Sequence, residues 1–164
     1  MKYCSQCGTK LIMKANGIDG KVPYCPKCQE FRFFKFSSAI SAIIFNPQKT
    51  KILLLQQYGR LEYILLSGYI NRGENAKQAL LREVMEETQL PVASYSYNDN
   101  AYYKPHDVLM HNYAVVVASE NVQANKEIDH YVWVPVSEAV GKIAPGSLAQ
   151  AFVKEWLEKG HIKG

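Results

Sequence analysis

The sequence predicts an α/β protein in which a mixed β-sheet flanked by helices follows a small ribbon held by cysteines. All four cysteines lie within the first 28 residues, as two Cys-x-x-Cys pairs. Apolar and β-branched segments separated by turn residues then fill residues 31–70 and 92–136. Helical patterns cover residues 75–89 and 147–160. This order predicts a ribbon over residues 1–33 and an α/β domain over residues 34–164.

The composition fits one ordinary domain with a small appendage. The chain has 164 residues, of which 48% are hydrophobic, which is enough to form a core. Its formal charge of +4 is compatible with an anionic ligand such as a phosphate ester. No apolar run approaches the roughly 20 residues needed to span a bilayer, and Cys4 precedes any apolar segment that could serve as a signal peptide. We therefore expect a cytoplasmic protein without a membrane partner.

The cysteine pairs, "CSQC" and "CPKC", have the spacing of a four-thiolate zinc site. Two disulfides or two redox-active pairs are the alternatives, and the missing secretory context disfavours disulfides. Four thiolates leave no open coordination position, so the expected Zn²⁺ is structural. A module of this size has little core of its own, so the metal supplies much of its folding energy. The predicted zinc ligands are Cys4, Cys7, Cys25 and Cys28.

Between the cysteine pairs, "ANGIDGKVPY" carries the Asn-Gly and Asp-Gly signals of tight turns and predicts short hairpin strands. Residues 31–46 then predict a long apolar strand, and "NPQKT" marks a turn. Residues 51–58 and 63–70 predict two more strands, separated by the turn "GRLE".

The first helical pattern, residues 75–89, has clear boundaries. Asn75 and Gln78 predict a capping box, and Pro91 ends the helix. Residues 92–99, 107–119 and 130–136 predict further strands. In the closing helix, the expected apolar side consists of Ala151, Phe152, Trp156 and Leu157, with Gly160 as its stop.

The stretch "LLREVMEETQL" gathers three carboxylates, those of Glu83, Glu86 and Glu87, within an arc of about 100° on the first helix. Like charges at this spacing repel by a few tenths of a kcal/mol per pair, roughly. Two explanations are open at this point. The face is simply solvated, or its hard oxygen ligands hold Mg²⁺ or Mn²⁺ together with phosphate oxygens of a substrate.

The residues before this helix decide between them. From Gly68 the chain has five residues, Glu74, seven residues, Arg82-Glu83-Val84, one residue, Glu86-Glu87, one residue, and Gln89-Leu90. This resembles the signature of the Nudix hydrolases, G-x5-E-x7-R-E-U-x-E-E-x-G-U with U aliphatic, and only its last glycine is replaced, by Gln89. The resemblance implies a Nudix α/β/α sandwich with a mixed sheet, and hydrolysis of a nucleoside diphosphate linked to another group.

The resemblance also implies roles for individual residues. The catalytic and metal-binding acids would be Glu83, Glu86 and Glu87, with the backbone carbonyl of Ser67 as a further ligand to Mg²⁺ or Mn²⁺. Gly68, Glu74 and Arg82 would be structural positions of the motif, and Arg82 and Glu74 would form the pair that supports the loop. The segment "KEIDHYVWVPV" resembles the family's later acid-bearing segment, which makes Glu127 the expected additional catalytic and metal-binding acid and Asp129 the alternative.

A four-cysteine ribbon ahead of a Nudix domain resembles the NADH pyrophosphatases, which form NMN and AMP. Their S-Q-P-W-P-F-P-x-S signature is absent, and "DNAYYKPHDVLMHNY" stands in its place. Here Tyr102 and Tyr103 are the candidate substrate-binding residues, by stacking on a base, although aromatic pairs more often serve packing. ADP-ribose, a nucleotide sugar and a non-catalytic nucleotide sensor are the alternatives. We expect a homodimer acting on a small nucleotide, with nucleic acid bound only as a capped RNA end.

Overall fold

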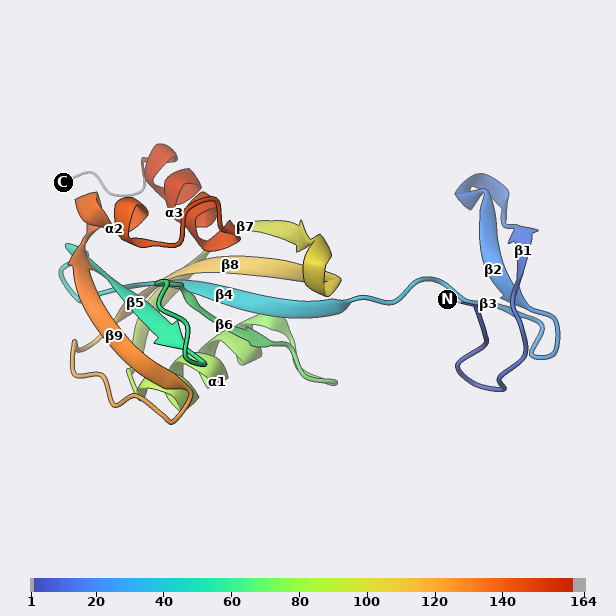
Figure 1. Ribbon diagram of the computed structural model, residues 1–164, viewed down its shortest axis with the longest axis horizontal. Helices are drawn as coiled ribbons and strands as arrows, with labels where there is room; N and C mark the ends of the chain where they lie inside the picture. Colours follow the sequence, from blue (N-terminus) through green and yellow to red (C-terminus); the bar gives the residue numbers. More distant parts are fainter. Residues whose placement is uncertain (1, 161–164) are drawn as a thin grey trace. The chain divides into compact units, whose positions relative to one another are not determined.

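The computed structural model describes residues 2–160 (Figure 1). The chain divides into two compact units, Met1–Phe36 and Ser37–Gly164, each considered by itself below. Among the described residues, no helix is long and apolar enough to cross a membrane.

The first unit is a small antiparallel sheet in the order β1-β2-β3. Its strands are β1 (Ile12–Ala15), β2 (Lys21–Cys25) and β3 (Glu30–Phe31), and the 3₁₀ turn η1 (Gly17–Asp19) joins the first two. Gly17 and Gly20 have φ values of 53° and 70°, in the left-handed region that glycine adopts without a steric penalty. The predicted hairpin between the cysteine pairs is therefore confirmed.

The prediction of one strand over residues 31–46 is wrong in part. β3 ends at Phe31 and β4 begins at Ser37, so no strand covers residues 32–36. Phe33, Phe34 and Phe36 in this interval are exposed. Their composition is typical of a strand, but a strand also needs a hydrogen-bonded neighbour, and that requirement is not visible in a local pattern.

The second unit is built on a mixed six-stranded sheet, as predicted. The strands follow the order β7-β8-β4-β5-β9, and β6 pairs with β4. Among the strands that the structure describes in this sheet, β4 and β8 pair in parallel and the other pairs are antiparallel. The bounds are β4 (Ser37–Phe45), β5 (Lys51–Gln57), β6 (Leu66–Tyr69), β7 (Val92–Tyr103), β8 (Val108–Val117) and β9 (Ile128–Pro135), with the 3₁₀ turn η2 (Lys104–His106) between β7 and β8.

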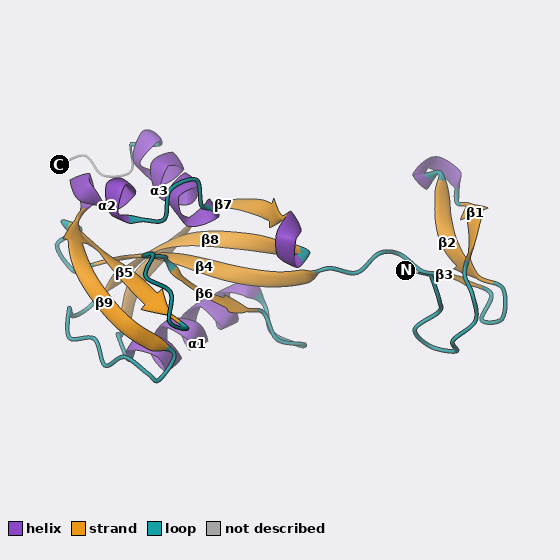
Figure 2. Ribbon diagram, in the orientation of Figure 1, coloured by secondary structure: helices purple, strands orange, loops and turns teal. Residues whose placement is uncertain are grey.

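Helices cover both faces of this sheet and make an α/β/α sandwich (Figure 2). One face packs against α1 (Ala76–Thr88) through a core that includes Ile40, Leu55 and Val84. The opposite face packs against α2 (Val136–Lys142) and α3 (Leu148–Glu158) through a core that includes Ile43, Ile52 and Trp156. Alternate residues of β4 thus contribute to different cores, as the period of two in a strand requires.

The boundaries of α1 match the sequence signals. Asn75 accepts a hydrogen bond from the Gln78 backbone, and the Gln78 side chain accepts one from the Asn75 backbone, so the predicted capping box is confirmed. At the other end, Gln89 takes a left-handed conformation with φ 54° and donates its N–H to the carbonyl of Met85. A helix commonly places glycine there, so Gln89 bears a conformational cost of about 1 kcal/mol.

The second helical layer departs from the prediction at two points. In α3 the buried residues are Phe152, Val153 and Trp156, whereas Ala151 is exposed, so Val153 takes the place expected for Ala151. The short α2 was not predicted at all. It begins after Pro135 without a side-chain cap, so it lacks the usual local start signal.

Candidate functional site

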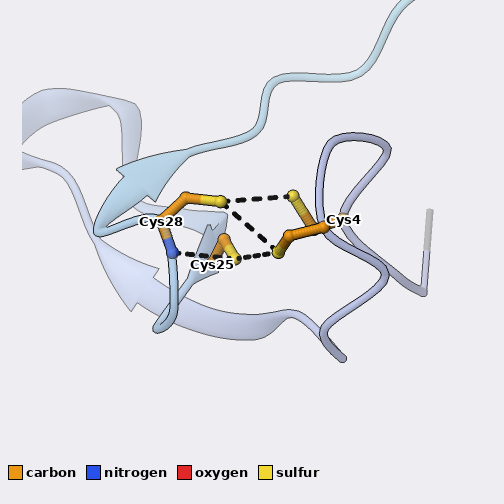
Figure 3. Close-up of side chains that lie close together, drawn as sticks. Cys4, Cys25 and Cys28 are labelled. Carbon is orange, nitrogen blue, oxygen red and sulfur yellow. Dashed lines mark hydrogen bonds between the residues drawn. The ribbon is translucent and has the colours of Figure 1, made fainter.

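The four cysteines of the first unit converge on one point (Figure 3). Cys25 ends β2, Cys28 follows on the next turn, and Cys4 and Cys7 lie on the turn before β1. Their Sγ atoms lie within 4.8 Å of one another, with 3.4 Å between Cys28 and Cys7 and 4.0 Å between Cys4 and Cys28. Tetrahedral zinc bonded at about 2.3 Å separates its sulfur ligands by about 3.8 Å, so this donor set fits Zn²⁺.

The electrostatics of the cluster favour a cation. The Arg32 guanidinium donates to the Cys4 sulfur at 3.3 Å and lowers the pKa of that thiol to about 6. The hydrogen bond with Cys7, followed by desolvation and the other two sulfurs, raises the pKa of Cys28 to about 12. The surroundings therefore favour the thiolate form of Cys4 and disfavour the thiolate form of Cys28. A bound divalent cation would stabilise the Cys28 thiolate as well.

In the second unit, Glu83 lies directly against the backbone of Gly68 in β6. A Cβ added at Gly68 would lie 2.0 Å from the Glu83 carboxyl carbon, closer than any side chain permits. Glycine at this position is thus required for the carboxylate to approach the strand. The carbonyl of the preceding residue, Ser67, belongs to the same strand. The carboxylate of Glu83 on α1 therefore packs against the backbone of β6. No pattern within either element predicts this contact.

Glu87 is the buried acid of the site. It is 3% exposed and accepts a hydrogen bond of 2.7 Å from the Gln57 side chain. Desolvation, reinforced by the charges of Glu83 and Glu127, raises the pKa of Glu87 to about 8. Desolvation also raises the pKa of Glu83. The structure thus gathers carboxyl groups where water does not stabilise their charged forms. Such an arrangement lowers stability and is common at functional sites.

Arg82 holds the segment between β6 and α1 in place. Its Nε and Nη2 donate to the two carboxylate oxygens of Glu74 at 2.8 and 2.9 Å, and Nη2 also donates to the Tyr69 carbonyl at 3.0 Å. The Arg82 hydrogen bond holds the pKa of Glu74 at about 2. Arg82 further pairs with Glu83 at 2.7 Å and with the exposed Glu86 at 3.1 Å. This bidentate geometry gives Arg82 and Glu74 a supporting position rather than a reacting one.

Glu127 reaches the acids because its loop caps the end of α1. The backbone N–H groups of Gln123 and Asn125 donate to the carbonyls of Thr88 and Glu87, which have no partner within the helix. Glu127 then lies near enough to raise the pKa of both Glu83 and Glu87. Sequence reasoning selected Glu127 by resemblance, and the loop contact gives a physical reason for its placement.

Two residues after β5 contact the later acids. Tyr58, left-handed at φ 56°, donates its hydroxyl to Glu127 at 2.9 Å, and the Gly59 N–H donates to Asp129 at 2.7 Å. The Glu127 hydrogen bond raises the pKa of the Tyr58 phenol. The Asp129 carboxylate thus accepts a hydrogen bond from a backbone N–H. The Glu127 carboxylate accepts one from Tyr58 and lies near enough to raise the pKa values of Glu83 and Glu87. Neither Tyr58 nor Gln57 carried a sequence signal.

A pocket of about 720 Å³ lies on the α3 side of the sheet. Ser67 of β6 lines it, so the pocket adjoins the strand against which Glu83 packs. Tyr103 also lines it, whereas the Tyr102 hydroxyl donates to Asp107. Other parts of the wall come from residues remote in sequence, namely Ser41, Arg60, Met110, the α2–α3 connection and Phe152. This size suits a drug-sized or nucleotide-sized ligand.

The acids fit a hard divalent cation by chemistry and charge. Their donors are carboxylate oxygens, which Mg²⁺ and Mn²⁺ prefer, and within the described residues no side-chain cation pairs with the buried carboxyl of Glu87. Their spacing is wider than that of the thiols. Within residues 2–160, only the cysteine cluster brings three candidate ligand atoms within 4.8 Å of one another.

Two curated relatives align with nearly the whole chain. The NAD-capped RNA hydrolase NudC of Pseudomonas aeruginosa is 24% identical over 159 residues, covering 96% of this chain and 56% of that protein. The protein of the same name from Vibrio vulnificus is 26% identical over 162 residues, with coverages of 96% and 59%. The chain thus spans little more than half the length of these relatives.

Solved structures agree on the fold. A NUDIX hydrolase from Nitrosomonas europaea has a TM-score of 0.69 at 20% identity. The aligned region includes 98% of this chain and 93% of the Nitrosomonas chain. The NUDIX domain of Shewanella oneidensis NrtR, complexed with ADP ribose, has a TM-score of 0.65 at 16% identity, with coverages of 83% and 93%. The NUDIX domain family model matches residues 35–157. Through these residues, which carry the whole acid site, the chain belongs to the Nudix hydrolase family.

Proposed function

We propose that this protein hydrolyses the diphosphate linkage of a nucleoside diphosphate derivative, with NAD(H) or the NAD cap of an RNA as the preferred substrate. The observation that carries the proposal is the burial of Glu87 within the influence of Glu83 and Glu127, on a helix whose Glu83 packs against β6, the strand that also lines the pocket. The names of the aligned relatives support an NAD-type dinucleotide. ADP-ribose and nucleotide sugars are the alternative substrates.

In this proposal the side chains of Glu83, Glu86, Glu87 and Glu127, with the Ser67 carbonyl, hold Mg²⁺ or Mn²⁺. When bound, the metal would neutralise phosphate charge and lower the pKa of a coordinated water. A carboxylate of the cluster accepts a proton from the attacking water. The water oxygen bonds to one phosphorus as the bridging oxygen leaves with the other, which yields two phosphate monoesters.

Other residues hold this arrangement. Arg82 fixes Glu74 and the carbonyl of Tyr69, so the segment that precedes α1 keeps its shape. Gln57 orients the Glu87 carboxylate, and Tyr58 does the same for Glu127. Tyr103 supplies an aromatic surface in the pocket, against which the ring of a nucleotide stacks. We also propose that the cysteine cluster holds a structural Zn²⁺, and that the protein acts as a homodimer.

The test is product analysis by chromatography. Purified protein with Mg²⁺ or Mn²⁺ receives NADH, NAD⁺, ADP-ribose, nucleotide sugars and NAD-capped RNA, and Glu87→Gln is run in parallel. We expect AMP and the nicotinamide mononucleotide from NAD(H), or a 5′-monophosphate RNA, and none of these from the variant.

Cleavage of another member of the panel would keep the diphosphate chemistry and refute the NAD assignment. Binding of a nucleotide without cleavage of any substrate would refute the hydrolase assignment and favour the sensor. Sedimentation of the purified protein tests the homodimer independently.

A further inference from the structure

A row of polar side chains crosses four strands of the sheet on its α3 face. Ser67 of β6 pairs with Ser41 of β4, and Ser41 pairs in parallel with Asn112 of β8. In β7 the register shifts between Tyr97 and Asp99, which leaves Asn98 as an extra residue opposite the same position. Such a bulge re-aims a side chain. Here it brings the Asn98 amide within 2.9 Å of Asn112.

Two groups of the C-terminal helical segment, both in contact with Asn98, fix the orientation of its amide. The Lys159 ammonium, which has only donors, lies 3.3 Å from Asn98 Oδ1 and 2.9 Å from the Asn98 carbonyl. The Phe152 carbonyl, which has only lone pairs, accepts from Asn98 Nδ2 at 3.0 Å. Glu155 and Asp99 pair with Lys159 and raise its pKa, so it stays a cation. Asn98 therefore presents its amide nitrogen, not its oxygen, to Asn112.

The orientation of the Asn98 amide in turn fixes the direction of the next two hydrogen bonds. Asn98 Nδ2 donates to Asn112 Oδ1, so the Asn112 nitrogen must point the other way, where it donates to Ser41 Oγ at 3.1 Å. Ser41 consequently acts as an acceptor toward the sheet. Its own hydroxyl proton finds no acceptor among the residues that the structure describes. Asn112 is fully buried and Ser41 is 5% exposed, so water does not easily reverse this order.

Ser41 is also part of the pocket wall. We propose that Ser41 is a specificity-determining residue of the substrate pocket, which donates its hydroxyl proton to an acceptor atom on the ring of a bound nucleotide. The inference rests on the proposed function for the identity of the ligand as a nucleotide. A ring that presents an N–H at this position could bond only to the second lone pair of Ser41 Oγ, and it would leave the buried hydroxyl proton without an acceptor, so such a ring binds more weakly.

The rest of the pocket suits such a ring. Tyr103, Met110, Phe152 and Leu148 give it aromatic and apolar walls, and Ser41 supplies a hydroxyl on the strand beside Ser67. β6 pairs with no strand other than β4 in the described part of the sheet, so its second edge is open. A nucleotide whose ring enters the pocket can therefore extend its diphosphate past β6 toward Glu83. Both rings of NAD carry acceptors, namely adenine N1, N3 and N7 and the nicotinamide carbonyl oxygen.

The test measures binding, not turnover. Calorimetry on the full chain without added divalent metal gives dissociation constants for NAD⁺, for its 1-deaza-, 3-deaza- and 7-deaza-adenine analogues, and for its thionicotinamide analogue. Each analogue removes or weakens one acceptor. The same five ligands are titrated into Ser41→Ala and into Ser94→Ala, a matched control in β7 whose exposed serine does not line this pocket.

We expect one analogue to bind the unaltered protein about two- to tenfold more weakly than NAD⁺, the loss of a single neutral hydrogen bond. Ser41→Ala should bind NAD⁺ and that analogue equally, whereas Ser94→Ala should keep the difference. The analogue that responds identifies the ring. A general loss of stability in Ser41→Ala would weaken all five ligands together and would not remove the difference between them.

If every analogue shows the same ratio to NAD⁺ in Ser41→Ala as in the unaltered protein, Ser41 does not select an acceptor and the inference is wrong. Because no cleavage is required, this outcome is separate from the fate of the hydrolase proposal. Binding with the expected difference but without cleavage would sustain the inference in a nucleotide sensor. Cleavage without the difference would overturn the inference alone.

Discussion

Replacing Glu87 with glutamine removes a buried ionisable group while keeping the side-chain length and an acceptor for the Gln57 amide. In the native protein, the pKa of Glu87 is raised to about 8, whereas the ordinary pKa of a free glutamate is 4.5. Between these pH values the native state holds a proton that the unfolded chain has released. The free energy of unfolding therefore falls as pH rises through this window, since the unfolded state binds fewer protons.

The magnitude follows from the size of the shift. One pKa unit corresponds to about 1.4 kcal/mol, so the 2.5 units between pH 4.5 and pH 7 give about 3 kcal/mol of destabilisation at pH 7. Glu87→Gln has no such proton to release. In metal-free buffer we expect the variant to be the more stable protein at pH 7, by an advantage that grows about 1.4 kcal/mol per unit between pH 5 and pH 8.

Urea unfolding at pH 5, 6, 7 and 8 measures this difference. The fluorescence of Trp133 and Trp156 reports the second unit alone, because both tryptophans belong to it. Glu86→Gln is the matched control, since its exposed carboxylate loses no desolvation cost. Added Mn²⁺ should stabilise the unaltered protein more than Glu87→Gln. A stability difference that stays constant from pH 5 to pH 8 would refute the reasoning about burial.

Gly68→Ala places a methyl group where the Glu83 carboxylate now lies, so we expect kcat/KM for the cleaved nucleotide to fall about 10²-fold with the fold retained; unchanged kinetics would refute the close-approach argument. Gln89→Gly removes the side chain from a left-handed residue and should raise the free energy of unfolding by about 0.5–1 kcal/mol in urea, whereas a loss would contradict it. Cys25→Ser should reduce the zinc content, measured by atomic absorption, from about one ion per chain to nearly none; a full complement of zinc in this variant would exclude the four-thiolate site.

The sequence was sufficient to predict features that residues within one turn determine, such as the start of α1. Asn75 and Gln78 fix the start of α1 by bonds within a single turn. The close approach of Glu83 to Gly68 was not predicted, because the contact joins a strand to a helix; the resemblance only named both residues as positions of one signature.

Features made by distant segments could not be predicted in this way. The pocket takes its walls from β4, β6, β7, β8 and the α2–α3 connection, and no pattern in any one of them indicates a cavity. Asn98 and Asn112 read as ordinary polar residues of strands. Their roles depend on a bulge in β7 and on Lys159 at the end of α3, about 60 residues away. Residues 32–36 show the converse, because their composition is typical of a strand although they belong to none.

The parallel pairing of β4 with β8 has a consequence for how the protein becomes active. Ser37 lies opposite Val108, so this ladder closes a loop of about 70 residues, which no local hairpin can nucleate. The same ladder sets Ser41 beside Asn112, and Glu127 lies beyond β8 in the chain. During synthesis the residues of α1 leave the ribosome well before these partners exist. The pocket residues Ser41 and Asn112 therefore come together only after β8 is made, and the full set of acids only after Glu127, so partly synthesised chains have neither.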